Sequence, residues 1–298
     1  MNMHASIAQA QPRRPLSTAI LSQFQKHPIG SAVALFAIDL LLGVLSGAAV
    51  QALLPQADAP FIAMCVVAVA IAGLLTLLHW WREVGFNGPD HWRSLGLLWL
   101  PATVAVVLPL LGGAQWLPAG TALYFTVAYL ITGFMEEAWM RGLVLRVLQP
   151  IGPIRAVLLS ALLFALLHST NLLFRNPAIV LAQMVGAFCF GVAFAALRLR
   201  TKTIWFVFGL HMLHDLFLHL TVFPVIPLNV VQDVILLIYG VYLLRGMAGG
   251  GHSDGNFRSE GEKGKSEFAQ SDKAATTPFF RFQYDLDQYA FVQKANLR

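Results

Sequence analysis

The sequence predicts an all-α membrane protein, a polytopic bundle of about eight transmembrane helices with both termini in the cytoplasm. The first observation is a shortage of charge, because charged residues make up only 12% of the 298-residue chain, whereas soluble domains carry about 25%. The second is that the apolar residues, 57% of the chain, gather in long runs. The third is that basic residues collect in alternate connections between these runs.

The apolar runs predict the individual helices, since a span needs about 17–25 mostly apolar residues. As a single helix of about 45 Å, the fourth run would exceed one hydrocarbon core, so we expect one end of it to protrude. Backbone polar groups in lipid must be satisfied internally, which makes a helical bundle the expected architecture. The runs lie at residues 31–54, 61–81, 94–113, 120–148, 155–174, 178–197, 203–223 and 226–245.

Basic residues predict the orientation of these helices. With the N-terminus inside, the segments assigned to the cytoplasm carry eleven basic residues, and those on the opposite side carry only Arg175. Cytoplasmic loops collect Lys and Arg, which also explains the net charge of +5 without nucleic acid. We therefore expect an integral multi-pass protein of the bacterial inner (cell) membrane, with the lipid bilayer as a partner and no nucleic acid. A eukaryotic endomembrane would also suit the span pattern.

The composition divides the chain into four parts. Residues 1–30 form a cytoplasmic N-terminal segment, and residues 31–119 form three accessory transmembrane helices. Residues 120–245 form five further helices, which carry the polar motifs described next. Residues 246–298 are rich in Gly, Ser and charge and bury little apolar surface, so we expect a disordered polar tail.

The first polar motif is GFMEEAWMRG, at Gly133 to Gly142, near the end of the fourth run. Ionisable side chains within spans carry a desolvation penalty and are rare, so each one marks a candidate functional site. Glu137 and Arg141 share one helical face, with the acid on the N-terminal side, the better order for an ion pair. Glu136 lies one step round the helix and would point elsewhere. Alternatively, both glutamates sit at a protruding cytoplasmic end and are simply hydrated.

Two further runs carry histidines at membrane depth. His168 ends the sequence FALLH, and His211 and Asp215 share one helical face in HMLHD. From the predicted cytoplasmic ends, His168 lies about 18 Å deep and His211 about 12 Å deep, which is compatible with one shared cavity. A lone histidine in a span is more often a hydrogen-bonding contact between helices. Here, however, three helices each offer titratable groups.

Peptide-bond hydrolysis would use such a set of carboxylates and histidines in a largely dry pocket. Burial favours the neutral form of a carboxyl group, so a buried glutamate can take a proton from water near neutral pH. Two imidazoles can hold that water or donate to the developing oxyanion. Alternatively, Zn²⁺ could activate the water. The sequence leaves both mechanisms open, and the suitable metal ligands are Glu136, His168, His211 and Asp215.

The three motifs can be written as EExxxR, FxxxH and HxxxD, which stand in EEAWMR, FALLH and HMLHD. In this order on separate predicted helices, they resemble the CPBP family of intramembrane proteases. That family includes the CAAX prenyl endopeptidases and the bacterial Abi proteins. The resemblance runs from about Gly133 to His219. It implies that residues 120–245 form a catalytic transmembrane domain that cleaves membrane proteins or lipidated peptides.

The resemblance also implies roles for individual residues. Glu136 would be the base that activates water. Members of the family are described both as metalloproteases and as glutamate proteases, so the zinc alternative stays open. Leu172 stands where some members have a polar residue after the FxxxH histidine, so a partner for that histidine would have to come from another span. The residues that would support Glu136 or complete the site are Glu137, Arg141, His168, His211 and Asp215.

Two other classes of function remain as alternatives. In a membrane immunity or binding protein of the Abi type, the same cluster would be structural. In a proton-coupled transporter, the intramembrane Glu and His residues would form a relay. Four polar residues fall outside the motifs: we expect packing for His214 and His219, a hydrated position for Asp233, and for Asp39 either a hydrogen bond between spans or a place on a substrate path.

Overall fold

The computed structural model of the 298-residue chain describes residues 16–55, 58–173 and 175–248. Contacts within the chain divide it into two units, Met1–Asp254 and Gly255–Arg298. The described residues all belong to the first unit, and nearly all of the predicted polar tail lies outside them. The last helix reaches Ala248, beyond the end of the last predicted span at residue 245.

The described residues are helical almost throughout and include no strand, apart from an isolated bridge between Ala114 and Thr221. The longer helices are α1 (Leu16–Lys26), α2 (Pro28–Leu53), α3 (Ala59–Leu77), α7 (Ala119–Glu137), α9 (Pro153–Leu167), α10 (Pro177–Thr201), α11 (Trp205–Leu220) and α12 (Val225–Ala248). The shorter segments are α4 (Trp81–Val84), η1 (Trp92–Leu98), α5 (Trp99–Ala102), η2 (Thr103–Val107), α6 (Leu108–Leu110), η3 (Ala138–Val144), α8 (Leu145–Leu148), η4 (Gln149–Ile151) and η5 (His168–Leu173).

The predicted class, a helical membrane bundle, is confirmed. In the described part of the chain, six helices are long and apolar enough to cross a membrane. The two other predicted spans also form helices, namely α7 with its continuation and α11. α11 has only 16 residues, fewer than the roughly 20 that a span needs, and α7 ends in two glutamates. The six spans are Pro28–Leu53, Ala59–Leu77, Trp92–Leu110, Pro153–Leu172, Pro177–Thr201 and Val225–Met247.

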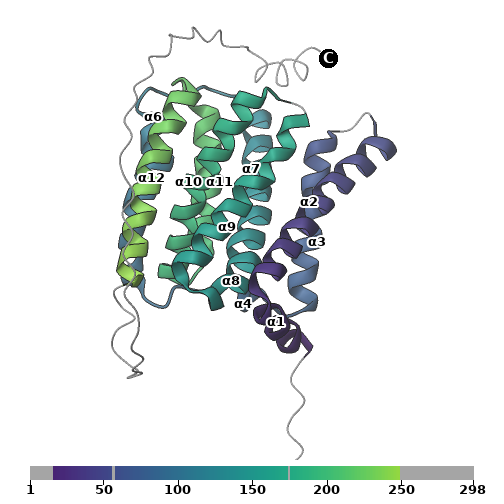
Figure 1. Ribbon diagram of the computed structural model, residues 1–298. Helices are drawn as coiled ribbons and strands as arrows, with labels where there is room; N and C mark the ends of the chain where they lie inside the picture. The colour runs from purple at the N-terminus through teal and green to yellow at the C-terminus, as the bar shows by residue number, and fades with distance from the viewer. Residues whose placement is uncertain (1–15, 56–57, 174, 249–298) are drawn as a thin grey trace, which may run out of the picture. The chain divides into compact units, whose positions relative to one another are not determined.

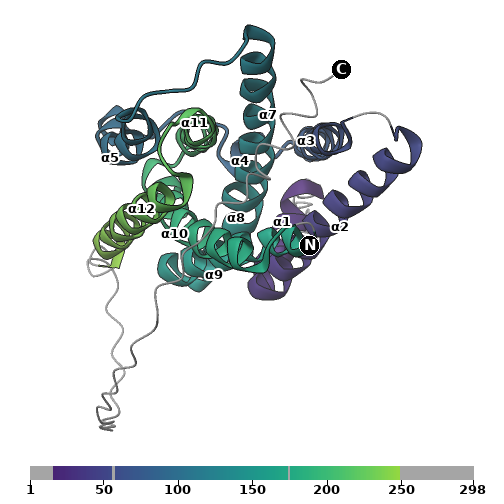
Figure 2. The ribbon, with the colours of Figure 1, turned by 90° about the horizontal axis from the view of Figure 1, so that it is seen from above.

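The long helices stand side by side, and α10 packs between α9 and α12 (Figures 1 and 2). α11 packs on α7, and α3 packs on both α2 and α7. The contact of α9 with α10 depends on small residues: a Cβ atom at Gly191 would lie 3.0 Å from the Cα and Cβ atoms of Ala161. Small residues allow the backbones of membrane helices to approach closely, as they do here.

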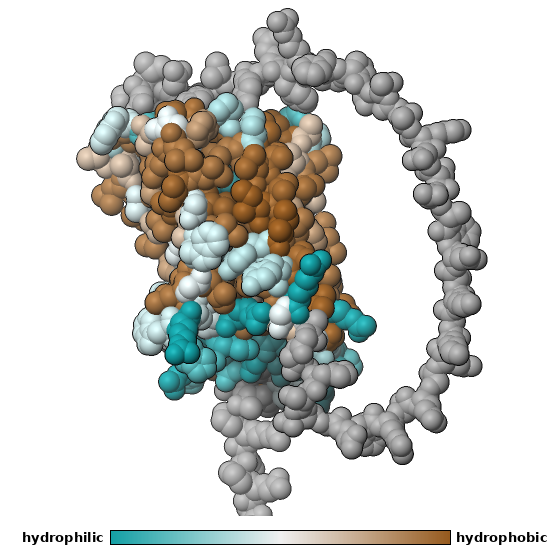
Figure 3. All heavy atoms as spheres, turned by 90° about the vertical axis from the view of Figure 1, so that its left-hand side faces the viewer, coloured by the Kyte–Doolittle hydropathy of each residue, from teal (hydrophilic) through white to brown (hydrophobic). Residues whose placement is uncertain are grey.

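Polar contacts join α3 to α7 at the start of both helices. Asp58 caps α3 by accepting a hydrogen bond from the backbone N–H of Phe61, at 3.2 Å. The hydroxyl of Tyr124, in the first turns of α7, donates to the other oxygen of Asp58 at 2.5 Å. The outward face fits a membrane setting, because apolar side chains cover most of its height and hydrophilic ones gather at one end (Figure 3).

Candidate active site

The two adjacent glutamates are the last residues of α7, and a π-helical segment, η3, follows them directly. A π-helix inserts an extra residue into a helical turn, and such segments are frequent at functional sites. All seven residues of η3 are buried, and the hydroxyl of Ser160 on α9 donates to the Met140 carbonyl at 3.3 Å. The run predicted as one helix at 120–148 is thus continuous, but it contains an irregular turn that its sequence did not reveal.

Gly133 brings α7 close to α11, one turn before the glutamates. A Cβ atom at this position would lie 3.3 Å from the Met212 backbone nitrogen and 3.3 Å from the Phe208 carbonyl oxygen. Contacts of that length are tighter than nearly all that real Cβ atoms make, so only a glycine leaves this separation between the helices unstrained. The close approach places the side chain of His211, which lies between these two α11 residues, within reach of α7.

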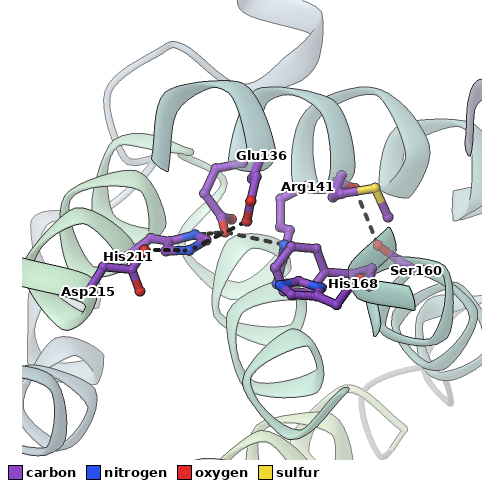
Figure 4. A network of polar contacts seen from close by, with 9 residues as sticks. Glu136, Arg141, Ser160, His168, His211 and Asp215 are labelled. Atoms are coloured by element: carbon purple, nitrogen blue, oxygen red, sulfur yellow. Dashed lines mark hydrogen bonds and ion pairs between the residues drawn. The ribbon is translucent and has the colours of Figure 1, made fainter. Parts of the chain in front are cut away.

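His211 lies at the centre of the polar cluster (Figure 4). Its Nδ1 atom lies 2.7 Å from Oε1 of Glu137, and its Nε2 atom lies 3.6 Å from Oε2 of Glu136. The same Nε2 atom lies 3.6 Å from Oδ2 of Asp215, one turn further along α11. Both nitrogens of the ring therefore face carboxylate oxygens. Glu136 does not point elsewhere, as the sequence suggested, but approaches the same imidazole as its neighbour.

The predicted ion pair between Glu137 and Arg141 is confirmed, with Nη1 of the arginine 3.2 Å from Oε1 of the glutamate. Both side chains are fully buried, so the alternative in which both glutamates are hydrated is wrong for Glu137. Glu136 keeps 21% of its side chain exposed. The guanidinium of Arg141 also lies 4.0 Å from the centre of the Phe164 ring, a cation–π contact that compensates part of its lost hydration.

His168 stands apart from the carboxylates. It begins η5 at the end of α9, and its Nδ1 atom lies 3.0 Å from the carbonyl oxygen of Phe164 in its own helix. Within the described ranges, no hydrogen bond or ion pair joins His168 to Glu136, Glu137 or His211. The expectation of a partner from another span is therefore wrong, because a free carbonyl at the end of α9 serves instead.

Aromatic rings connect His168 to the cluster. The centroid of the Phe164 ring lies 5.0 Å from that of His168 and 6.2 Å from that of His211. Phe190 of α10 also lies beside His211, with its ring centroid 4.8 Å from that of the imidazole. Sequence reasoning missed Phe190, because a phenylalanine in an apolar run gives no signal of its own. These rings form an apolar wall around the imidazoles.

The metal alternative needs at least three ligands in one place. Among the described residues, no three His, Cys, Asp or Glu side chains form a group that could hold a metal ion. His168, one of the four predicted ligands, donates from Nδ1 to the Phe164 carbonyl, which leaves its Nε2 atom free, and in the described chain it makes no polar contact with the other three. The residues that the structure describes thus form no metal site as they stand, and no chemical step below is routed through a metal.

The remaining polar residues are packed rather than hydrated. His214 is buried, with its ring centroid 5.2 Å from that of Phe190, and His219 lies against Phe125 at 3.8 Å. Asp233 was expected to be hydrated, but it is half-buried beside Gly186 of α10, where a Cβ atom would lie 2.6 Å from its Oδ2 atom. The close packing of α12 on α10 explains this difference.

The fold and the cluster together define an integral membrane protein with a largely buried polar cluster, made of carboxylates, histidine and arginine. Residues 118–217 match the family model described as type II CAAX prenyl endopeptidase Rce1-like. This match covers about a third of the chain, confirms the resemblance to the CPBP family of CAAX proteases, and includes Glu136 through Asp215. It supports a CAAX-protease-like intramembrane endopeptidase in general. No curated protein matches the chain.

Proposed function

We propose that the protein is an intramembrane endopeptidase in which Glu136 activates the water that attacks the scissile peptide bond. The observation that carries this proposal is the pair of adjacent glutamates on opposite nitrogens of His211, within the segment that matches the protease family. Of these two carboxylates, Glu137 is held by Arg141 and His211, and only Glu136 remains free to act as a base. The alternatives, an immunity or binding protein and a transporter, give no reason for this division between the two.

Glu137 supports the site rather than acting as its base. Its Oε1 atom contacts both Arg141 and His211, and its side chain is fully buried. Glu136 is partly exposed, and the described residues offer its carboxylate no partner closer than the 3.6 Å contact with His211. A general base must reach the proton that it abstracts. Of the two adjacent acids, Glu136 is the one that a water molecule can reach.

The imidazoles take two different parts in the proposed reaction. Glu137 holds Nδ1 of His211, so the ring is fixed. With carboxylates at both of its nitrogens, the ring can hold a proton on each, and Nε2 can then donate to the oxyanion that develops on the substrate carbonyl. Asp215 restrains the same ring from the α11 side. Nδ1 of His168 donates to a backbone carbonyl, which leaves Nε2 as an acceptor for the second proton of the water.

The proposed reaction is a balanced hydrolysis. Glu136 accepts one proton as the water oxygen bonds to the substrate carbonyl carbon, and the tetrahedral intermediate carries its negative charge beside His211. Glu136 then returns this proton to the nitrogen as the C–N bond breaks, giving a carboxylic acid and an amine. We propose as substrates membrane proteins or lipidated peptides in the bacterial inner membrane, because the site lies among helices that are apolar on the outside.

The experiment compares peptide termini in membranes of cells that carry the wild type, Glu136→Gln or Glu83→Gln. Removal of a general base lowers the rate by about 10²–10⁴-fold, so we expect termini that appear with the wild type to vanish with Glu136→Gln. Glu83→Gln is the matched control, because Glu83 is exposed and pairs only with Arg146 in the described chain. Membranes of cells that carry Glu83→Gln should contain the same peptide termini as those of cells that carry the wild type.

Two outcomes would decide against the proposal. Identical termini for wild type and Glu136→Gln, at equal protein levels, would favour an immunity or binding protein. Loss of cleavage by the purified wild type on treatment with a chelator, and its return with Zn²⁺, would replace the glutamate mechanism by the metalloprotease one. We expect cleavage to resist the chelator.

A further inference from the structure

Asp39 lies on α2, outside the segment that matches the protease family. α2 buries only three of its residues, Ala32, Leu35 and Val50. Ala32 and Leu35 belong to the core cluster, and Asp39 follows Leu35 by four residues, so it lies on the same helical face. The face of α2 that packs on the rest of the described protein thus carries an acidic side chain.

A buried hydrogen bond fixes this face against the active-site helix. The indole Nε1 of Trp139, in η3, donates to the carbonyl oxygen of Leu35 at 3.1 Å. α2 and α7 run in opposite directions (Figure 1). Asp39 comes one turn after Leu35, and Glu136 comes about one turn before Trp139. From this bond the antiparallel helices carry both acids in the same direction, and Asp39 comes close enough to Glu136 for their carboxyl groups to repel.

Among the residues that the structure describes, Asp39 has no partner that would explain its position. It is half-buried, and among the described residues no group forms a hydrogen bond or an ion pair with it. The first of the two expectations from the sequence, a hydrogen bond between spans, is therefore not supported by the described residues. Acidic side chains at membrane depth normally face a partner or a functional cavity. Here the charged group with which Asp39 interacts is the proposed base.

Two carboxyl groups that face each other at low dielectric repel, and a positive group between them removes this repulsion. Arg141 does not supply the positive charge, because its guanidinium lies between Glu137 and the Phe164 ring. Elsewhere in the described ranges, no Lys or Arg pairs with Asp39 or Glu136, and the imidazole of His211, 3.6 Å from Glu136, is shared with Glu137 and Asp215. A bound substrate is then the natural source of a cation or of hydrogen-bond donors at this position.

We propose that Asp39 is a specificity-determining residue, which selects a Lys or Arg side chain beside the scissile bond on the α2 side of the site. This inference rests on the proposed function, because it assumes that the substrate is cleaved at Glu136. It extends the site beyond the matched segment, since the accessory helix α2 would supply one wall. It also predicts that a substitution at Asp39 changes the preference for a charged side chain while the proposed catalytic residues stay in place.

The test uses the full chain, purified and placed in vesicles of neutral phosphatidylcholine, so that lipid charge does not bias the result. The probe is the peptide identified from the terminus experiment, synthesised with either Lys or Glu at each residue that flanks the cleaved bond. We expect the wild type to cleave the Lys form at least about tenfold more efficiently at one of these positions, a ratio that corresponds to about 1.4 kcal/mol.

Asp39→Asn should reduce this preference to within twofold, mainly through a higher KM for the Lys peptide, and Asp39→Glu should restore it. Asp233→Asn is the matched control, because Asp233 is also a half-buried acid but lies on α12 against α10. A merely structural role for Asp39 would lower kcat for both peptides equally and leave their ratio unchanged.

The outcomes separate this inference from the proposed function. An unchanged Lys-to-Glu ratio in an active Asp39→Asn variant would overturn the inference alone, and so would an equal change in Asp233→Asn. A wild type that cleaves neither peptide would overturn the proposed function as well. Thermal unfolding of each variant in detergent shows whether a loss of activity reflects a loss of folded protein.

Discussion

Two pairs of helices in the same chain differ in how much of their apolar length is buried within the protein. In α9 and α10, 39% and 44% of the most apolar stretch is buried within the protein, whereas in α2 and α3 the shares are 11% and 22%. Yet α2 and α3 are the more apolar pair. In a membrane protein, strong hydropathy therefore marks the surface that meets lipid, because lipid is as apolar as any protein core.

The central helices differ from the outer ones in what holds them together. Lipid gives no hydrophobic reason for helices to associate, so close packing and internal polar contacts must do so. In α9 and α10 the packing comes from small residues such as Gly191 and Ala161. In α7 and α11 it comes from Gly133 and from the contacts of His211. The candidate site thus also stabilises the bundle.

The largest effect on stability should come from the buried ion pair. Arg141→Met would leave the carboxylate of Glu137 buried without its arginine, and breaking a buried pair in this way costs about 3–5 kcal/mol. The matched variant Arg146→Met removes an exposed partner of Glu83, where the side chains are 34% and 46% exposed. Exposed pairs contribute about 0–1 kcal/mol. The measurement is the free energy of unfolding in detergent micelles.

Equal losses of unfolding free energy for Arg141→Met and Arg146→Met would contradict the expectation that the buried pair stabilises the protein more than the exposed pair does. In that case the Glu137–Arg141 pair would behave as a hydrated pair despite its burial. A large loss from Arg146→Met alone would show that the connection between α4 and α8 matters more to the fold than the central cluster does.

The sequence could predict the helices and part of the site, because both depend on local spacing. The position of Arg141 four residues after Glu137 was enough to predict their ion pair. The meeting of α7 with α11 could not be derived in the same way. It depends on the close approach that Gly133 allows. A contact between two separate helices produces no periodic pattern that could be read in the sequence of either one.

The sequence also could not reveal the role of irregular backbone or of aromatic neighbours. The π-helical segment η3 contains mostly helix-forming residues, and nothing in its sequence distinguishes the irregular turn from an ordinary helix. Phe190 looks like any other residue of an apolar span. Asp39 was visible as an anomaly in the sequence, but only the bond between Trp139 and Leu35 shows what it faces.

A second prediction tests packing without charge. Gly191→Leu would force a side chain into the backbone of α9, since even a Cβ atom would lie 3.0 Å from Ala161. Overpacking of this kind costs about 1–3 kcal/mol. The matched variant Gly43→Leu lies on exposed α2 with no atom within 4 Å of the added Cβ. It should be neutral in the same unfolding measurement, and a comparable loss there would show that α2 is packed as tightly as α10.

The smallest effect should come from the contact that joins the two regions. Trp139→Phe keeps an aromatic ring in the core but removes the hydrogen bond to the Leu35 carbonyl. Such a bond contributes about 0.5–1.5 kcal/mol, and its loss should fall on α2 rather than on the central helices. Hydrogen exchange read by mass spectrometry should show faster exchange near Leu35, with α9 and α10 unchanged.

The same variant connects stability to specificity. If α2 supplies a wall of the site, loosening it should weaken the preference for the Lys peptide while kcat for the Glu peptide stays the same. Faster exchange in α2 with an unchanged preference would mean that Asp39 keeps its place without this bond. The outer helix would then be held to the site by its other packing contacts, those of Ala32 and Leu35 in the core cluster.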